Sequence, residues 1–191
     1  NNLNTISLII LFIFPRFILH RLSLNKESIP LKKNHYFHLP VNIHRNIRFT
    51  FVIPPYQLET KRSRQALPSS VSLSRAISQA QRPPILLEGL SKLNPELIKT
   101  GIEDELHVTQ RLKLLRGARN LIALAYQAGA LGATISGAGS ALLIITRTGA
   151  VRNLEARLNK RVQRLWGNDG MVITTSGCNK GSSFLRFSPR N

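Results

Sequence analysis

A short stretch of small residues is the segment of this chain best suited to approach a ligand closely. Residues 129–140 read GALGATISGAGS, between a helical pattern and an apolar run. Because glycine has no Cβ and readily adopts positive φ, such a turn lets backbone approach a ligand and can present N–H groups to an anion. Most glycine-rich turns are only tight turns. The flanking sequence must therefore decide between a ligand-binding turn and a purely structural one.

Asp104 and His107 are the second pair of residues whose types and spacing suit chemistry. They lie three residues apart, which on a helix places both side chains on one face. A catalytic acid–base pair is one interpretation. We favour the other, in which the two residues orient Arg111 or fix the helix end by hydrogen bonds. No catalytic residue is therefore assigned.

The sequence contains no cluster of residues with metal-ligand spacing. The other four histidines all lie in the first 46 residues: His20, His35, His38 and His44. The single cysteine, Cys178, excludes an intramolecular disulfide framework and favours a reducing compartment.

Length and composition favour one well-packed domain with strongly basic segments. The chain has 191 residues, 42% of them hydrophobic, and a net charge of +18. The excess of Lys and Arg lies in the first fifty and the last eighty residues. Nucleic acid, an anionic membrane and a polyanionic small molecule are all compatible with such a charge.

Residues 1–46 differ in composition from the rest, and we expect them to be a disordered or non-native extension. The apolar run Ile6–Phe14 is stopped by Pro15 and is shorter than the roughly twenty residues that span a membrane. A targeting segment or a membrane anchor are the alternatives. The chain does not begin with Met, and its only Met is Met171, which suggests a fragment or a translation extended upstream. Residues 47–191 are expected to form the domain.

The elements that would position these residues can be read from periodicity and from cap residues. Residues 48–53 alternate and predict a strand, and a weak helix at 72–81 is expected to break at Pro83 and Pro84. Asn94 and Pro95 are a typical N-cap and first position for a helix with Leu97, Ile98, Ile102 and Leu106 as its buried stripe.

Further along, the patterns predict a helix from Gly117 to Gly129, strands at 134–136 and 141–146, a helix with a basic face at 150–166 and an edge strand at 171–174. The predicted fold class is therefore α+β, with a ferredoxin-like antiparallel sheet and helices on one of its faces.

Five segments, in order, resemble motifs of the homoserine kinases, a family of GHMP kinases. Residues 53–54 (IP) and 59–68 (ETKRSRQALP) are similar to I-P…T-K-x-x-R-x-x-L-P, and residues 104–111 (DELHVTQR) to D-x-L-H-x-x-x-R. Residues 115–117 (LRG) resemble L-x-P-G, and residues 132–140 resemble G-x-x-I-S-G-A-G-P. The resemblance covers about half of the chain and suggests the carboxy-terminal half of such a kinase.

The resemblance implies an enzyme that transfers a phosphoryl group from ATP, with Mg²⁺, to the side-chain hydroxyl of L-homoserine in threonine biosynthesis. Arg64 and Arg111, with His107, stand where the family binds substrate. A guanidinium pairs bidentately with a carboxylate, which would hold the hydroxyl in place for the transfer. Gly137, Ala138 and Gly139 stand where the family's turn supports the phosphate loop. The partners that the resemblance implies are homoserine, ATP and an amino-terminal kinase half, with a second copy of the chain as a further candidate.

The sequence departs from the family pattern at several positions. Ser140 and Arg116 replace prolines, and the phosphate loop P-x-x-x-G-L-G-S-S does not occur in the sequence. Without that loop we expect this chain to be inactive alone. A basic module that binds RNA or an acidic membrane, and a GHMP kinase for another small alcohol, are the alternatives, although we expect neither a specific nucleic acid nor a membrane as partner. The expected location is cytoplasmic, or a plastid if the source is a plant or alga.

Overall fold

A four-stranded antiparallel sheet forms the centre of the structure, a computed structural model that describes residues 41–177. The strands are β1 (Ile47–Ile53), β2 (Gly132–Ile135), β3 (Leu142–Arg147) and β4 (Met171–Ser176), in the order β2-β3-β1-β4. The strand predicted at 171–174 therefore lies at an edge, as expected. The α+β class and the antiparallel sheet are confirmed.

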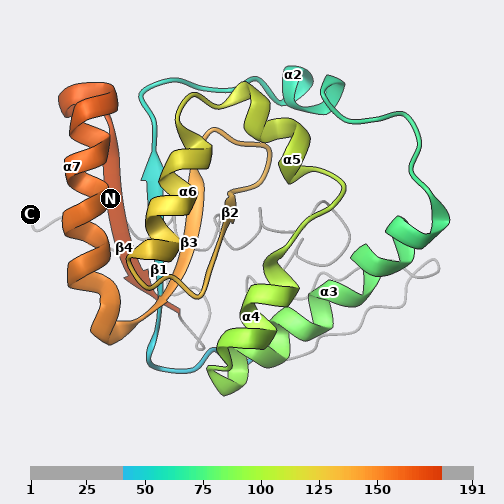
Figure 1. The fold of residues 1–191 in the computed structure, drawn as a ribbon, viewed down its shortest axis with the longest axis horizontal. Helices are drawn as coiled ribbons and strands as arrows, with labels where there is room; N and C mark the ends of the chain where they lie inside the picture. The colour runs from blue at the N-terminus through green and yellow to red at the C-terminus, as the bar shows by residue number, and fades with distance from the viewer. Residues whose placement is uncertain (1–40, 178–191) are drawn as a thin grey trace, which may run out of the picture.

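Helices cover both faces of this sheet (Figure 1). On one face lie α6 (Ala118–Gln127) and α7 (Val151–Trp166), and on the other lie α3 (Leu73–Lys92) and α4 (Pro95–Ile102). Two short helices, α2 (Thr60–Gln65) and α5 (Val108–Arg111), lie near the turn between β2 and β3. Short 3₁₀ turns complete the chain at 112–114, 148–150 and 167–169.

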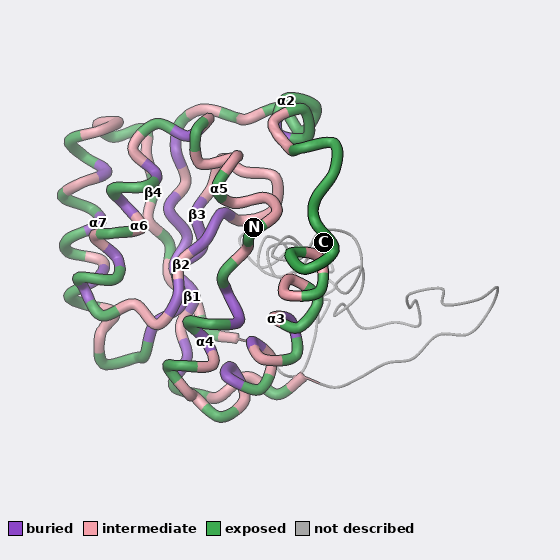
Figure 2. The backbone as a smooth tube through the Cα atoms, turned by 45° about the vertical axis from the view of Figure 1, so that its right-hand side comes forward, coloured by how far each residue is buried: buried purple, intermediate pink, exposed green. Residues whose placement is uncertain are grey.

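The expectation of helices on one face is wrong because the central strands are apolar on both sides. Phe51 and Leu143 pack toward α3 and α4, whereas Val52 and Leu142 pack toward α6 and α7. Figure 2 shows the resulting concentration of buried residues in the strands. Strands buried on both faces are near-continuous apolar runs, and residues 141–145 are such a run, so this segment of the sequence already indicated a strand covered on both faces.

The predicted break at Pro83 and Pro84 is also wrong, because α3 continues through both residues. Each proline removes a backbone donor, and helix-interior prolines are costly in isolation. Here Pro83 is buried, and Leu86 and Leu90 beyond it pack in the same core as α4. Tertiary packing therefore stabilises a helix that local propensity disfavours.

The N-cap of α4 is confirmed, whereas its predicted length is not. The Asn94 side chain accepts hydrogen bonds from the backbone N–H groups of Glu96 and Leu97, at 3.0 and 3.1 Å. The helix ends at Ile102, because Glu103 is extended. Leu106, assigned to the buried stripe of this helix, lies instead in the following turn and is half-buried.

The remaining predicted elements, at 48–53, 117–129, 134–136, 141–146 and 150–166, are confirmed to within a few residues. The domain boundary at residue 47 stays a prediction, because residues 1–40 lie outside the described residues. Residues 41–46 contact the domain, since the His44 N–H donates to the Leu90 carbonyl at 3.0 Å. Among residues 41–177, no helix is long and apolar enough to cross a membrane.

Candidate functional site

The glycine turn connects β2 to β3 over residues 136–140. Gly137 and Gly139 have φ values of 61° and 98°, a conformation that favours glycine. The Gly139 N–H donates to the Ser136 carbonyl at 3.1 Å, and a Cβ on Gly139 would lie 3.2 Å from Leu58 Cδ2. Gly139 is therefore required by the turn and by packing against the protein.

Two side chains hold this turn from outside, and a third holds it from within. Ser63 Oγ donates to the Ala138 carbonyl at 2.6 Å, and Arg111 Nη1 donates to the Gly137 carbonyl at 2.9 Å. From within the turn, Ser140 Oγ donates to the Tyr56 carbonyl at 2.7 Å. Within the described residues, the N–H groups of Gly137 and Ala138 have no protein acceptor. The bonds to its carbonyls fix the turn, and its unused N–H groups give it the chemistry of an anion-binding loop.

Arg111 is the last residue of α5 and lies half-buried beside the turn. Its Nη1 is bonded to Gly137, whereas its Nε is buried and has no partner among the described residues. Burial lowers the pKa of Arg111, and the positive charge of Arg64 lowers it further against the opposing influence of Asp104. Two neighbouring guanidinium groups favour an anion between them.

Arg64 extends from α2 and is exposed. The same short helix supplies the buried Ser63, so one helical turn brings both a support for the glycine turn and an exposed cation to the site. Segments predicted from separate motifs, at 59–68, 104–111 and 132–140, thus meet in space. Ser63 and its bond to Ala138 were not predicted, because a serine in a polar helix has no distinguishing pattern in a single sequence.

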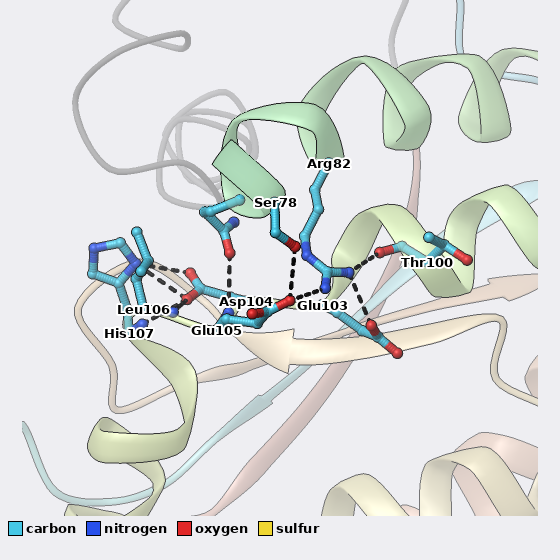
Figure 3. Close-up of polar contacts among 9 residues, drawn as sticks. Ser78, Arg82, Thr100, Glu103, Asp104, Glu105, Leu106 and His107 are labelled. Atoms are coloured by element: carbon cyan, nitrogen blue, oxygen red, sulfur yellow. Dashed lines mark hydrogen bonds and ion pairs between the residues drawn. The ribbon is translucent and has the colours of Figure 1, made fainter. Parts of the chain in front are cut away.

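Asp104 and His107 lie in the turn before α5 rather than on one face of a helix (Figure 3). Asp104 Oδ1 accepts hydrogen bonds from the Leu106 and His107 N–H groups at 2.8 and 2.5 Å, and Oδ2 lies 2.9 Å from His107 Nδ1. Burial opposes the charge of Asp104, but the bonds from His107 outweigh burial and lower the pKa of this carboxyl. The favoured interpretation, hydrogen bonding that fixes the helix end, is confirmed for this turn, and the helical placement is wrong.

Among residues 41–177, no group of three or more His, Cys, Asp or Glu side chains could hold a metal ion. The site described here therefore consists of cations, backbone N–H groups and one carboxylate that is already hydrogen-bonded. Such a site suits the binding of an anionic ligand.

Comparison with known proteins identifies relatives that are kinases of a small molecule, which agrees with a site for an anionic ligand. The model of the GHMP kinase C-terminal family matches residues 86–164. A homoserine kinase of Prochlorococcus marinus (strain MIT 9515) is 34% identical over 148 residues, which are 76% of this chain and 46% of the relative. One from Aquifex aeolicus is 29% identical over 136 residues, or 71% of this chain and 46% of the relative. The chain thus spans less than half the length of these relatives.

A solved structure of homoserine kinase from Cytophaga hutchinsonii has the same fold. It superposes with a TM-score of 0.64 at 26% identity, over 74% of this chain and 44% of that one. The antiparallel sheet and its helices have the fold of that structure, and residues 86–164 match the carboxy-terminal domain family of the GHMP kinases. Within the family, the chain is similar to the carboxy-terminal part of homoserine kinases.

Proposed function

We propose that this chain supplies the amino-acid-binding side of a homoserine kinase site, where ATP phosphorylates the side-chain hydroxyl of L-homoserine. The observation that supports the proposal is the position of Arg111. Its guanidinium is fixed on the Gly137 carbonyl and lies near the exposed cation of Arg64.

In this proposal the substrate carboxylate binds between Arg64 and Arg111. A planar guanidinium binds both oxygens of a carboxylate, which orients the ligand as well as attracting it. His107 would contact the same ligand through Nε2, because Nδ1 is already engaged by Asp104. Anchoring the amino-acid end restricts the hydroxyl to positions from which phosphoryl transfer is favoured.

The proposed role of Gly137, Ala138 and Gly139 is to support the triphosphate rather than to hold it alone. The unused N–H groups of Gly137 and Ala138 fit an anionic neighbour. When bound, ATP supplies the transferable phosphoryl group, and Mg²⁺ supplies positive charge that offsets the negative charge of the phosphates. We assign no metal ligand to the described residues. The cytoplasmic location and an amino-terminal kinase half as partner remain parts of the proposal.

Calorimetric titration of the chain with L-homoserine tests the proposal. We expect Arg111→Ala and Arg64→Ala each to weaken binding by about tenfold or more, since each removes a charge-assisted contact to the carboxylate. Arg119→Ala, which removes an exposed arginine from α6, is the matched control and should bind as the unmodified chain does.

The ligand supplies a second control. The amino alcohol in which CH₂OH replaces the carboxylate should bind weakly to the unmodified chain and equally weakly to both variants. The assignment of these arginines would be contradicted if the unmodified chain bound the acid and the alcohol with equal affinity. It would also be contradicted if folded Arg111→Ala bound L-homoserine as tightly as Arg119→Ala.

A further inference from the structure

Arg82 binds the acidic loop that joins α4 to α5 (Figure 3). Its Nη1 donates to the Thr100 carbonyl at 2.7 Å and to Glu103 Oε2 at 2.8 Å, and its Nη2 donates to Glu105 Oε1. One guanidinium on α3 thus joins the end of α4 to two glutamates in the following loop. Its side chain is only 12% exposed, so these contacts are partly shielded from water.

Two further side chains of α3 hold the same loop. Ser78 Oγ donates to Glu105 Oε1 at 3.0 Å, and Gln79 Oε1 accepts from the Glu105 N–H at 3.0 Å. Glu105 is therefore bound through both its backbone and its carboxylate. Since Glu103 is bound by Arg82 as well, the residues on both sides of Asp104 are attached to α3.

The backbone of Asp104 is thereby fixed, and Asp104 in turn holds the start of α5. Its Oδ1 accepts from the N–H groups of Leu106 and His107, which precede and begin that helix. A four-residue helix has almost no internal hydrogen bonds, and its N-cap His107 has no side-chain cap hydrogen bond, so its direction depends on the turn that precedes it. The direction of α5 decides where Arg111 points.

We propose that Arg82 is a positioning residue, which sets the place of Arg111 by holding the loop 103–105 around Asp104. This proposal depends on the proposed function only for the identity of the ligand that Arg111 binds. The contacts from Arg82 to α5 do not depend on it. Arginine suits this task better than lysine, because its planar fork reaches two carboxylates and a carbonyl at once. The hydrogen bonds from Arg82 and Ser78 also lower the pKa of Glu105, in agreement with these contacts.

Hydrogen exchange of the full chain, followed by NMR, measures the predicted effect without any ligand. In Arg82→Met, we expect the Leu106 and His107 amides to exchange about tenfold faster or more, because their acceptor loses its fixed position. Amides of the central strands, such as Phe51 and Leu143, should keep their rates. In Arg82→Lys, the exchange rates of these two amides should lie between those of Arg82→Met and those of the unmodified chain. Arg152→Met, which changes an exposed arginine on α7, is the matched control.

A double-mutant cycle then separates positioning from general stabilisation. If Arg82 acts through Asp104, the exchange rates at Leu106 and His107 in Arg82→Met with Asp104→Asn should be no faster than in Asp104→Asn alone. Additive effects, unchanged rates in Arg82→Met, or faster exchange spread over the sheet as well would overturn the proposal. L-Homoserine affinity, measured in parallel, should fall about tenfold in Arg82→Met.

The two proposals can fail independently. Faster exchange at Leu106 and His107 together with unchanged homoserine binding in Arg111→Ala would retain the positioning role and reject the substrate assignment. Weaker homoserine binding in Arg111→Ala without any change in exchange in Arg82→Met would do the reverse.

Discussion

Asp104 connects the acid stability of the protein to the geometry of its site. Because its pKa in the folded chain lies below the ordinary value of 3.8, the unfolded chain takes up a proton at this group first as pH falls. The stability that the carboxylate contributes is therefore fully present above pH 3.8 and is lost as pH falls through the lowered pKa of the folded chain.

Asp104→Asn should remove this contribution while keeping the shape of the side chain. We expect the variant to be less stable than the unmodified chain by roughly 1–2 kcal/mol near neutral pH, since it loses charge-assisted hydrogen bonds. The difference should close at acid pH, below the ordinary pKa of the carboxyl. Urea unfolding at a series of pH values measures it. A difference that stays constant across the series would show that the charge of Asp104 is not responsible.

The side chains of the site differ in how far the sequence predicts them. Arg64, Arg111 and the glycine turn belong to ordered motifs, so their candidacy could be proposed from the sequence, although their roles stay predictions. Ser63, Ser140 and Arg82 act through contacts with residues distant in the chain, and nothing in their local sequence indicates those partners. The bond between Asp104 and His107 was predictable from spacing, but the turn that forms it was not.

The crossing of α3 and α4 depends on two glycines that let the helices approach closely. A Cβ on Gly89 would lie 2.7 Å from the Ile98 nitrogen, and one on Gly101 would lie 2.4 Å from the Leu86 nitrogen. Because backbone atoms cannot move aside without shifting a helix, the two helices must separate to accept a larger residue. The sequence gives no sign of this crossing, since helix-interior glycine reads as a weak break.

Gly101→Ala is expected to destabilise the fold by about 1–3 kcal/mol through overpacking, despite the better helix propensity of alanine. Thermal and urea unfolding measure the change. Gly149→Ala is the matched control, since a Cβ there meets nothing within 4 Å, and it should leave stability nearly unchanged. If the two variants unfold alike, the close approach of α3 and α4 is not as described.

The molecule as a whole has two cores, one on each face of the sheet. Periodicity predicted most helices and strands because their buried stripes are local, yet it placed the helices on one face. The second core forms from α3 and α4. Local patterns predicted that α3 breaks at its prolines and that α4 extends beyond Ile102, and neither holds. The assignment of a helix to a sheet face is a long-range property that no window of sequence contains.

The basic face of α7, in contrast, was predicted from the local sequence pattern. Arg152, Arg157, Lys160 and Arg164 are exposed, whereas Leu154, Leu158 and Val162 pack into the core between α7 and the sheet. No ion pair joins these cations to a carboxylate among the described residues. Binding of RNA or an acidic membrane by this face is the alternative interpretation, and such binding should weaken steeply with salt, unlike homoserine binding.

Phosphoryl transfer by a completed site tests the central claim most directly. Joining the amino-terminal half of the Prochlorococcus marinus homoserine kinase to residues 41–191 in one chain supplies the segment of the relative that this chain does not match. With L-homoserine and MgATP, we predict ADP release that falls about a hundredfold in Arg111→Ala, because the substrate loses its anchor, and is unchanged in Arg119→Ala. Equal rates in both variants, or no release from a folded chimera, would contradict the claim that this domain holds the substrate-binding side of a homoserine kinase.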